Sequence, residues 1–147
     1  MAIQWILVAQ RAGARLFQSS PSGTHLQLVK NIVHPAGRMT DGDFISDKAG
    51  RFFSPAGSSR SATDSENTPH DHESEVFALR LAEMLEQGRN QNEYDQLVLI
   101  AEPRFLGKIQ AALTRPTAAK VVKIIDKGIA NLNEHELAQR LTVLIAA

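Results

Sequence analysis

The sequence predicts a three-layer α/β protein with helices on both faces of one mixed, five-stranded sheet. Near the start of the chain, turns rich in glycine or proline separate three apolar segments, at residues 3–9, 14–19 and 24–33. This pattern is typical of an antiparallel meander. Later segments alternate between helical and strand patterns, and a strand–helix–strand connection makes its two strands parallel. We therefore expect strand order 3-2-1-4-5, of ribonuclease H-like type, in a single domain over residues 1–147.

Composition excludes several classes of protein. The chain of 147 residues is 43% hydrophobic and 22% charged, as in ordinary globular domains, and it contains no cysteine. Disulfide frameworks and thiolate zinc sites are therefore excluded. No apolar run is long enough to span a membrane. The start, Met1–Trp5, has no basic residues before its apolar stretch, unlike a signal peptide, and we expect a cytoplasmic protein without a cofactor.

The three meander strands have different signals. Residues 3–9 form an almost continuous apolar run, as expected for a central strand buried on both faces. The third strand alternates imperfectly, because Leu26 and Leu28 share one face while Val29 lies on the other. A β-bulge in this strand would reconcile the two patterns.

Three helices are expected in the rest of the chain. Thr68 fits the N-cap of the first helix and Pro69 its first helical position, and Gly88 is expected to end it. The second helix begins at Pro103, and the third follows Asn133. The two remaining strands are the apolar runs between these helices, at residues 96–101 and 119–125.

The charge is divided along a chain whose formal net charge is zero. Residues 64–95 contain nine acidic and two basic residues, whereas residues 102–127 contain six basic and two acidic ones. Opposed charged faces present a field to an anionic partner. Solvated helix faces have the same composition, so both interpretations stay open.

A long loop, residues 34–67, lies between the third strand and the first helix. It has no helical or strand period and holds four of the nine glycines. A loop of this length is usually functional or disordered. Phe44, Phe52 and Phe53 are expected to anchor its first half, because disordered segments are poor in aromatic residues. Residues 56–67 contain no large apolar side chain and are expected to be mobile.

Several short motifs lie in and beside this loop, at residues 33–38, 41–43, 46–47, 50–51 and 56–60. These motifs resemble those of the host attachment protein family. Two further segments also resemble that family, Pro103–Gly107 directly after a buried strand and residues 132–137 near the end of the chain. The resemblance covers most of the chain. The loop residues that carry it include His34, Gly37, Arg38, Asp41, Gly42, Asp47, Gly50, Arg51, Gly57 and Arg60.

The family is grouped with bacterial relatives of the central, peptidyl-tRNA-hydrolysing domain of archaeal and eukaryotic release factors. The resemblance therefore implies a release-factor-like domain. In those factors a Gly-Gly-Gln loop stands before a long helix, whereas the corresponding segment here reads Ala56-Gly57-Ser58-Ser59-Arg60. The implied function is non-enzymatic association with RNA or the ribosome. The alternatives are a hydrolase acting at the loop and the sheet edge, and a surface protein that takes part in host attachment.

The residues expected to bind RNA phosphates are Arg38, Arg51, Arg60, Arg104 and Lys108. Arg104 begins a helix that follows a buried strand, where open α/β sheets gather ligands and where helix N-termini favour anions. Lys108 lies one helical turn later. The alternative for Arg104 is a contact with Asp43 or Asp47 that holds the loop.

Signals for a metal or a catalytic group are weak. His70 with Glu73, and His72 with Glu75, have the spacing that places two ligands on one helix face, but the two histidines point apart. A polar, capped helix end explains the same residues. No Gly-x-Ser-x-Gly, Walker A or Gly-x-Gly-x-x-Gly motif occurs. We therefore assign neither a metal nor a catalytic residue.

Overall fold

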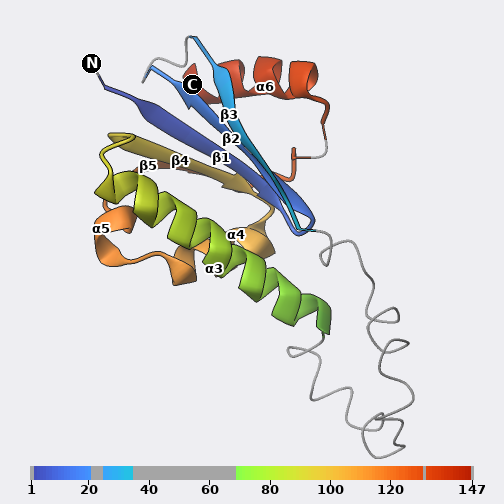
Figure 1. Cartoon of the computed structure of the whole chain (residues 1–147). Coiled ribbons are helices and arrows are strands. Elements are labelled where there is room, and N and C mark those ends of the chain that lie inside the picture. Colours follow the sequence, from blue (N-terminus) through green and yellow to red (C-terminus); the bar gives the residue numbers. More distant parts are fainter. Residues whose placement is uncertain (1, 21–24, 35–68, 131, 147) are drawn as a thin grey trace, which may run out of the picture.

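The computed structural model describes residues 2–20, 25–34, 69–130 and 132–146. Helices cover both faces of a five-stranded sheet, with α6 on one face and α3, α4 and α5 on the other (Figure 1). The predicted α/β class and the strand order β3-β2-β1-β4-β5 are both confirmed.

The strands are β1 (Gln4–Gln10), β2 (Gly13–Ser19), β3 (Gln27–Val33), β4 (Gln96–Ala101) and β5 (Val121–Ile125). The helices are α3 (Pro69–Asn90), α4 (Pro103–Ala112), α5 (Arg115–Ala118) and α6 (Glu134–Ala146). Pairing is antiparallel between β1 and β2 and between β2 and β3, and parallel between β1 and β4 and between β4 and β5. Strand β2 therefore runs against the other four.

Strand β1 is buried on both faces, as its apolar run predicts. Trp5 and Leu7 pack in the cluster beneath α3 and α4, whereas Ile6 and Val8 pack in the cluster beneath α6. Side chains of a strand alternate between the two faces of a sheet, so one short segment contributes to both halves of the core.

The predicted bulge in the third strand is confirmed. Leu16 of β2 pairs with Lys30, but the next residue, Phe17, pairs with Leu28, so Val29 is the extra residue. The strand begins at Gln27, later than the predicted start at residue 24, which lies outside the described residues.

The prediction that Gly88 ends the first helix is wrong, because α3 continues to Asn90. A Cβ atom on Gly88 would lie 2.6 Å from the ring of Trp5. The glycine therefore permits close approach of α3 to β1 rather than a change of backbone direction. The left-handed conformation after the helix belongs to Asn92, with φ 56°.

The other helix boundaries agree closely with the sequence. Helices α3 and α4 begin at Pro69 and Pro103 as predicted, although the proposed cap Thr68 lies outside the described residues. The backbone N–H of Glu136 donates to Asn133 Oδ1 at 2.8 Å, and Asn133 Nδ2 donates to Glu136 Oε1, so the capping pair is confirmed. Helix α5 was not predicted, and it delays the start of β5 from residue 119 to residue 121.

Tyr94 closes the packing around Gly88. Its ring stacks on Trp5 with 4.7 Å between centroids, and its hydroxyl donates to the Leu85 carbonyl oxygen at 2.6 Å. Burial raises the pKa of Tyr94 to about 12, because the phenolate would lose its hydration.

We predict that Gly88→Ala lowers the free energy of unfolding by about 1–3 kcal/mol, because the new methyl group would overlap the Trp5 ring. The control is Gly107→Ala in α4, where a Cβ atom would meet nothing within 4 Å. Helix propensity should make that variant more stable, by about 0.5–1 kcal/mol. Chemical denaturation of both variants checks the prediction. A stabilised Gly88→Ala protein would contradict it.

The second prediction uses the single tyrosine of the chain. A folded-state pKa of about 12 lies above the ordinary value of 10.0, so Tyr94 contributes stability below pH 10 that is lost as pH rises towards 12. The phenolate absorbance should therefore titrate near pH 12 in the folded protein and near pH 10 in denaturant. Circular dichroism identifies the range in which the fold is intact, and a folded-state midpoint near 10 would refute the burial of the hydroxyl.

Candidate functional site

The carboxyl ends of β1, β3 and β4 lie at one edge of the sheet, because these strands are parallel. From this edge the chain leaves β1 towards β2 on one side and leaves β4 towards β5 on the other. Such a divergence between neighbouring parallel strands is the position at which open α/β sheets bind ligands.

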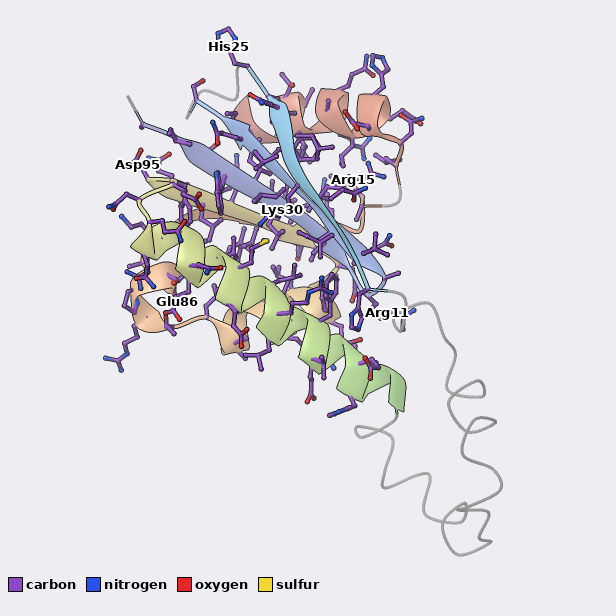
Figure 2. All side chains as sticks on the ribbon, in the orientation of Figure 1. Arg11, Arg15, His25, Lys30, Glu86 and Asp95 are labelled. Carbon is purple, nitrogen blue, oxygen red and sulfur yellow. The ribbon has the colours of Figure 1, made fainter. Side chains whose placement is uncertain are left out.

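A cavity of about 500 Å³ opens at this point on the α3 and α4 side of the sheet. Its walls come from the end of β1 and the turn after it, from the start of α3 and from the start of α4. The lining residues are Gln10, Arg11, Ala12, Ser74, Glu102, Arg104, Phe105 and Lys108. Figure 2 shows Arg11 at the tip of the β1–β2 hairpin. We call this the basic cavity.

The described lining of the basic cavity has more basic than acidic residues. Arg11, Arg104 and Lys108 are basic, and Glu102 is acidic. Lys108 Nζ lies 3.9 Å from Glu75 Oε1, and the Glu75 side chain is 63% exposed.

Glu102 is occupied as the N-cap of α4. Its Oε1 accepts from the Phe105 N–H at 2.8 Å, and its carbonyl oxygen accepts from the Leu106 N–H at 2.9 Å. Pro103 has no N–H to offer. The first-turn amides of α4 are thus largely used or missing, so the charged side chains, rather than the helix N-terminus proposed from the sequence, are the main anion-binding groups.

The aromatic residue of the cavity is not available for stacking on a ligand. Phe105 is 1% exposed, and its ring packs against Phe77 with 5.9 Å between centroids. A base of a nucleic acid therefore finds no open aromatic face on the described lining. The described lining therefore offers a ligand charge and hydrogen bonds rather than stacking.

His34 lies beside the cavity and joins three elements. Its backbone N–H donates to the Ala12 carbonyl oxygen at 2.9 Å, and its Nε2 lies 3.1 Å from Glu73 Oε1. The ring stacks on Phe77 with 4.6 Å between centroids and 6° between planes. Arg80 adds a bond from Nη1 to the Val33 carbonyl oxygen at 3.3 Å. His34, a residue of the loop motif, therefore holds the end of β3 against the β1–β2 turn and α3.

The structure describes two of the residues proposed to bind phosphate. Arg104 and Lys108 line the same cavity. The remaining phosphate and motif candidates, together with the phenylalanines of the loop, lie outside the described residues. They are Arg38, Arg51, Arg60, Gly37, Asp41, Gly42, Asp47, Gly50, Gly57, Phe44, Phe52 and Phe53.

The weak metal candidates find other neighbours. Glu73 contacts His34, and Glu75 contacts Lys108. His72 is exposed, and the side chain of His70 is outside the described part. Among the described residues no group of three or more ligating side chains could hold a metal ion.

The basic residues of segment 102–127 do not form one continuous face. Arg104 and Lys108 lie at the carboxyl edge, but Lys120 lies at the amino edge, where its carbonyl oxygen accepts from the Leu97 N–H. Lys123 donates to the Leu144 carbonyl oxygen, and Lys127 lines a separate cavity against α6. The segment includes β5, which runs from the amino edge to the carboxyl edge of the sheet, so its basic residues lie at both edges.

Sequence reasoning missed Arg11, Ser74 and Glu102. Arg11 lies in the turn between the first two strands, and Glu102 was counted only as one of the two acidic residues of segment 102–127. The signal they share is their position at the carboxyl edge of the sheet. Arg11 directly follows β1 and Glu102 directly follows β4, whereas Ser74 lies in the first turns of α3 at the same edge.

Comparison with known proteins identifies a family that this chain resembles over most of its length. The model of a family described as "Protein required for attachment to host cells" matches residues 5–141. A search of curated proteins gives no match. In the described part of the chain, every helix is too short or too polar to cross a membrane.

We predict that Glu102→Ala lowers the free energy of unfolding by about 1 kcal/mol, the usual cost of removing an N-cap acceptor. Glu102→Gln retains an acceptor oxygen for the Phe105 N–H and should lose clearly less. Denaturation midpoints of the two variants show whether the N-cap hydrogen bond or the negative charge of Glu102 stabilises α4. Equal losses would mean that the carboxylate charge, and not the hydrogen bond, stabilises α4.

Proposed function

We propose, for a chain that belongs to the family described as "Protein required for attachment to host cells", that the basic cavity binds a phosphate-rich polyanion. The proposed ligand is RNA, free or in the ribosome. The family description names a process and no ligand, so the ligand is argued from the cavity.

One observation carries the proposal. Arg11, Arg104 and Lys108 line a single cavity at the point where the chain leaves β1 and β4 in opposite directions. Arginine binds phosphate oxygens through two parallel N–H donors, and lysine acts as a compact point charge. The three side chains come from two distant parts of the sequence, so the fold is required to gather them. A cavity of about 500 Å³ has room for a nucleotide unit.

The lining also predicts how RNA would be recognised. Its cations suit phosphates, and the buried ring of Phe105 offers no stacking surface. Phosphate contacts position a nucleic acid without reading its sequence. We therefore expect little sequence preference and a strong dependence of affinity on salt concentration.

The release-factor-like relationship and the ribonuclease H-like type of the sheet belong to this proposal. The strand order and the 22-residue helix α3, which follows the loop, support both. Binding to RNA or the ribosome would also place the protein in the cytoplasm, as expected from the sequence.

A hydrolase is the second candidate, and one contact favours it. His34 pairs with Glu73 next to Ser74, a lining residue of the basic cavity. A carboxylate that orients a histidine is a common part of general-base sites. The His34 ring is also buried and stacked on Phe77, which suits a structural role equally well.

The proposal is tested by titrating a labelled single-stranded RNA, and separately ribosomal subunits, at increasing salt. Arg104→Ala, Lys108→Ala and Arg11→Ala should each weaken binding about tenfold at low salt, as expected for one charge-assisted contact. Each lost phosphate contact should also lower the slope of log affinity against log salt by about 0.7.

The matched control is Arg115→Ala, which removes a cation of the same basic segment from α5, outside the lining of the basic cavity. It should leave affinity and slope unchanged. Wild-type protein without salt-dependent binding would refute the RNA proposal. Equal effects of Arg115→Ala and Arg104→Ala would show that diffuse charge, not the cavity, binds the ligand. Product release from an aminoacyl or phosphoester substrate would favour the hydrolase.

A further inference from the structure

A smaller cavity lies on the other face of the sheet. Its volume is about 170 Å³. Its walls come from the ends of β1 and β3, from the start of β2 and from the connection before α6. The lining residues are Val8, Gln10, Ala12, Gly13, Ala14, Arg15, Asn31, Ile32, Val33 and Ala130. We call this the Arg15 cavity.

Register places the Arg15 side chain on the α6 face. Arg15 pairs with Val8 of β1 and with Asn31 of β3, and Val8 packs in the cluster beneath α6. Residues that pair directly across neighbouring strands point to the same face. Figure 2 shows Arg15 on the side of the sheet where α6 and the connection before it lie.

The guanidinium of Arg15 has an unsatisfied hydrogen-bond donor. This donor is Nη1, which is buried and has no hydrogen-bond partner. Arginine stays charged at any physiological pH, so the group cannot become neutral to avoid the cost of burial. The described lining of the cavity includes no aspartate or glutamate. The Arg15 side chain as a whole is partly buried, but a buried donor of a charged group without a hydrogen-bond partner is unfavourable.

One other buried side-chain atom in the described structure shares this lack of a partner, Gln4 Oε1. It differs in kind, because Gln4 is neutral and its Nε2 donates to Gln96 Oε1 at 3.3 Å. Arg15 therefore stands apart as a charged group that faces a cavity large enough for an ion.

We propose that the Arg15 cavity binds a small oxyanion, with inorganic phosphate as the representative ligand. The anion would accept hydrogen bonds from the Arg15 guanidinium, and the Asn31 side chain, paired with Arg15 in the sheet, supplies a second donor from the same face. The volume suits an ion or a single phosphate group and is too small for a nucleotide. The site is separate from the basic cavity, because the two lie on opposite faces of the sheet and share only residues near the β1–β2 turn.

The test measures stability against phosphate concentration at constant ionic strength, with chloride as the balancing anion. A ligand that binds only the folded state raises the ratio of folded to unfolded protein by 1 + [L]/Kd. Wild-type protein should thus gain about elevenfold in this ratio at a phosphate concentration ten times Kd. Arg15→Met removes the charge at similar volume, so it should lose the gain and be at least as stable as wild type in chloride alone.

Further variants locate the effect. Arg115→Met removes a cation that is in the described lining of neither cavity and should keep the full phosphate response, whereas Arg15→Lys keeps the charge without the forked donors and should weaken it. A full response in Arg15→Met would overturn the proposal. A response lost in Arg11→Met, which removes a cation of the basic cavity, but kept in Arg15→Met would place the anion in the basic cavity, and this outcome would leave the RNA proposal standing.

A readout on wild-type protein covers the case in which Arg15→Met fails to fold. In NMR spectra, phosphate should shift the Arg15 Nε–H and Asn31 side-chain amide signals in a saturable manner, and equal ionic strength of chloride should not. Acetate and sulfate titrations show whether a carboxylate or another tetrahedral anion competes. Unmoved Arg15 and Asn31 signals at saturating phosphate would overturn the proposal.

Discussion

Burial of β1 on both faces is the constraint on which the rest of the structure depends. Six consecutive residues, Gln4–Ala9, are buried. Full burial of a large aliphatic side chain contributes about 1.5–3 kcal/mol, and every residue of a strand contributes in this way only when both faces of the sheet are covered. Helices α3 and α4 cover the side of Leu7, and α6 covers the side of Ile6. The three layers follow from this one strand.

The same constraint places the two candidate sites. A strand buried on both faces ends abruptly at the protein surface, and Gln10 is the first exposed residue after the buried run. Both cavities meet at this residue, one on each face. Cationic side chains are excluded from the dry core but tolerated at its rim, where ligand or water can reach them. Arg11 and Arg15 flank the end of β1 for this reason.

Features set by neighbours in the sequence, and the strand order that follows from the connections, could be predicted, whereas individual side-chain contacts between distant residues could not. The Asn133–Glu136 cap and the bulge at Val29 depend on residues close in the chain, and both were found from sequence. Gly88 was misinterpreted because its reason is the ring of Trp5, which only the fold brings near. Composition likewise showed the basic segment but not the direction of β5, which separates its charges. Arg104 was proposed as a site residue through topology, and the same reasoning applied to the end of β1 would have proposed Arg11.

The contact of Trp5 with Tyr94 and Gly88 determines what spectroscopy can observe in this protein. The chain has one tryptophan and one tyrosine, and they stack on each other. Both belong to the amino edge of the sheet, since Trp5 lies near the start of β1 and Tyr94 lies two residues before β4. Intrinsic fluorescence is therefore a native reporter of whether α3 is docked on the sheet. It is nearly blind to ligands at the carboxyl edge, so an unchanged emission spectrum on adding RNA or phosphate carries no information about binding.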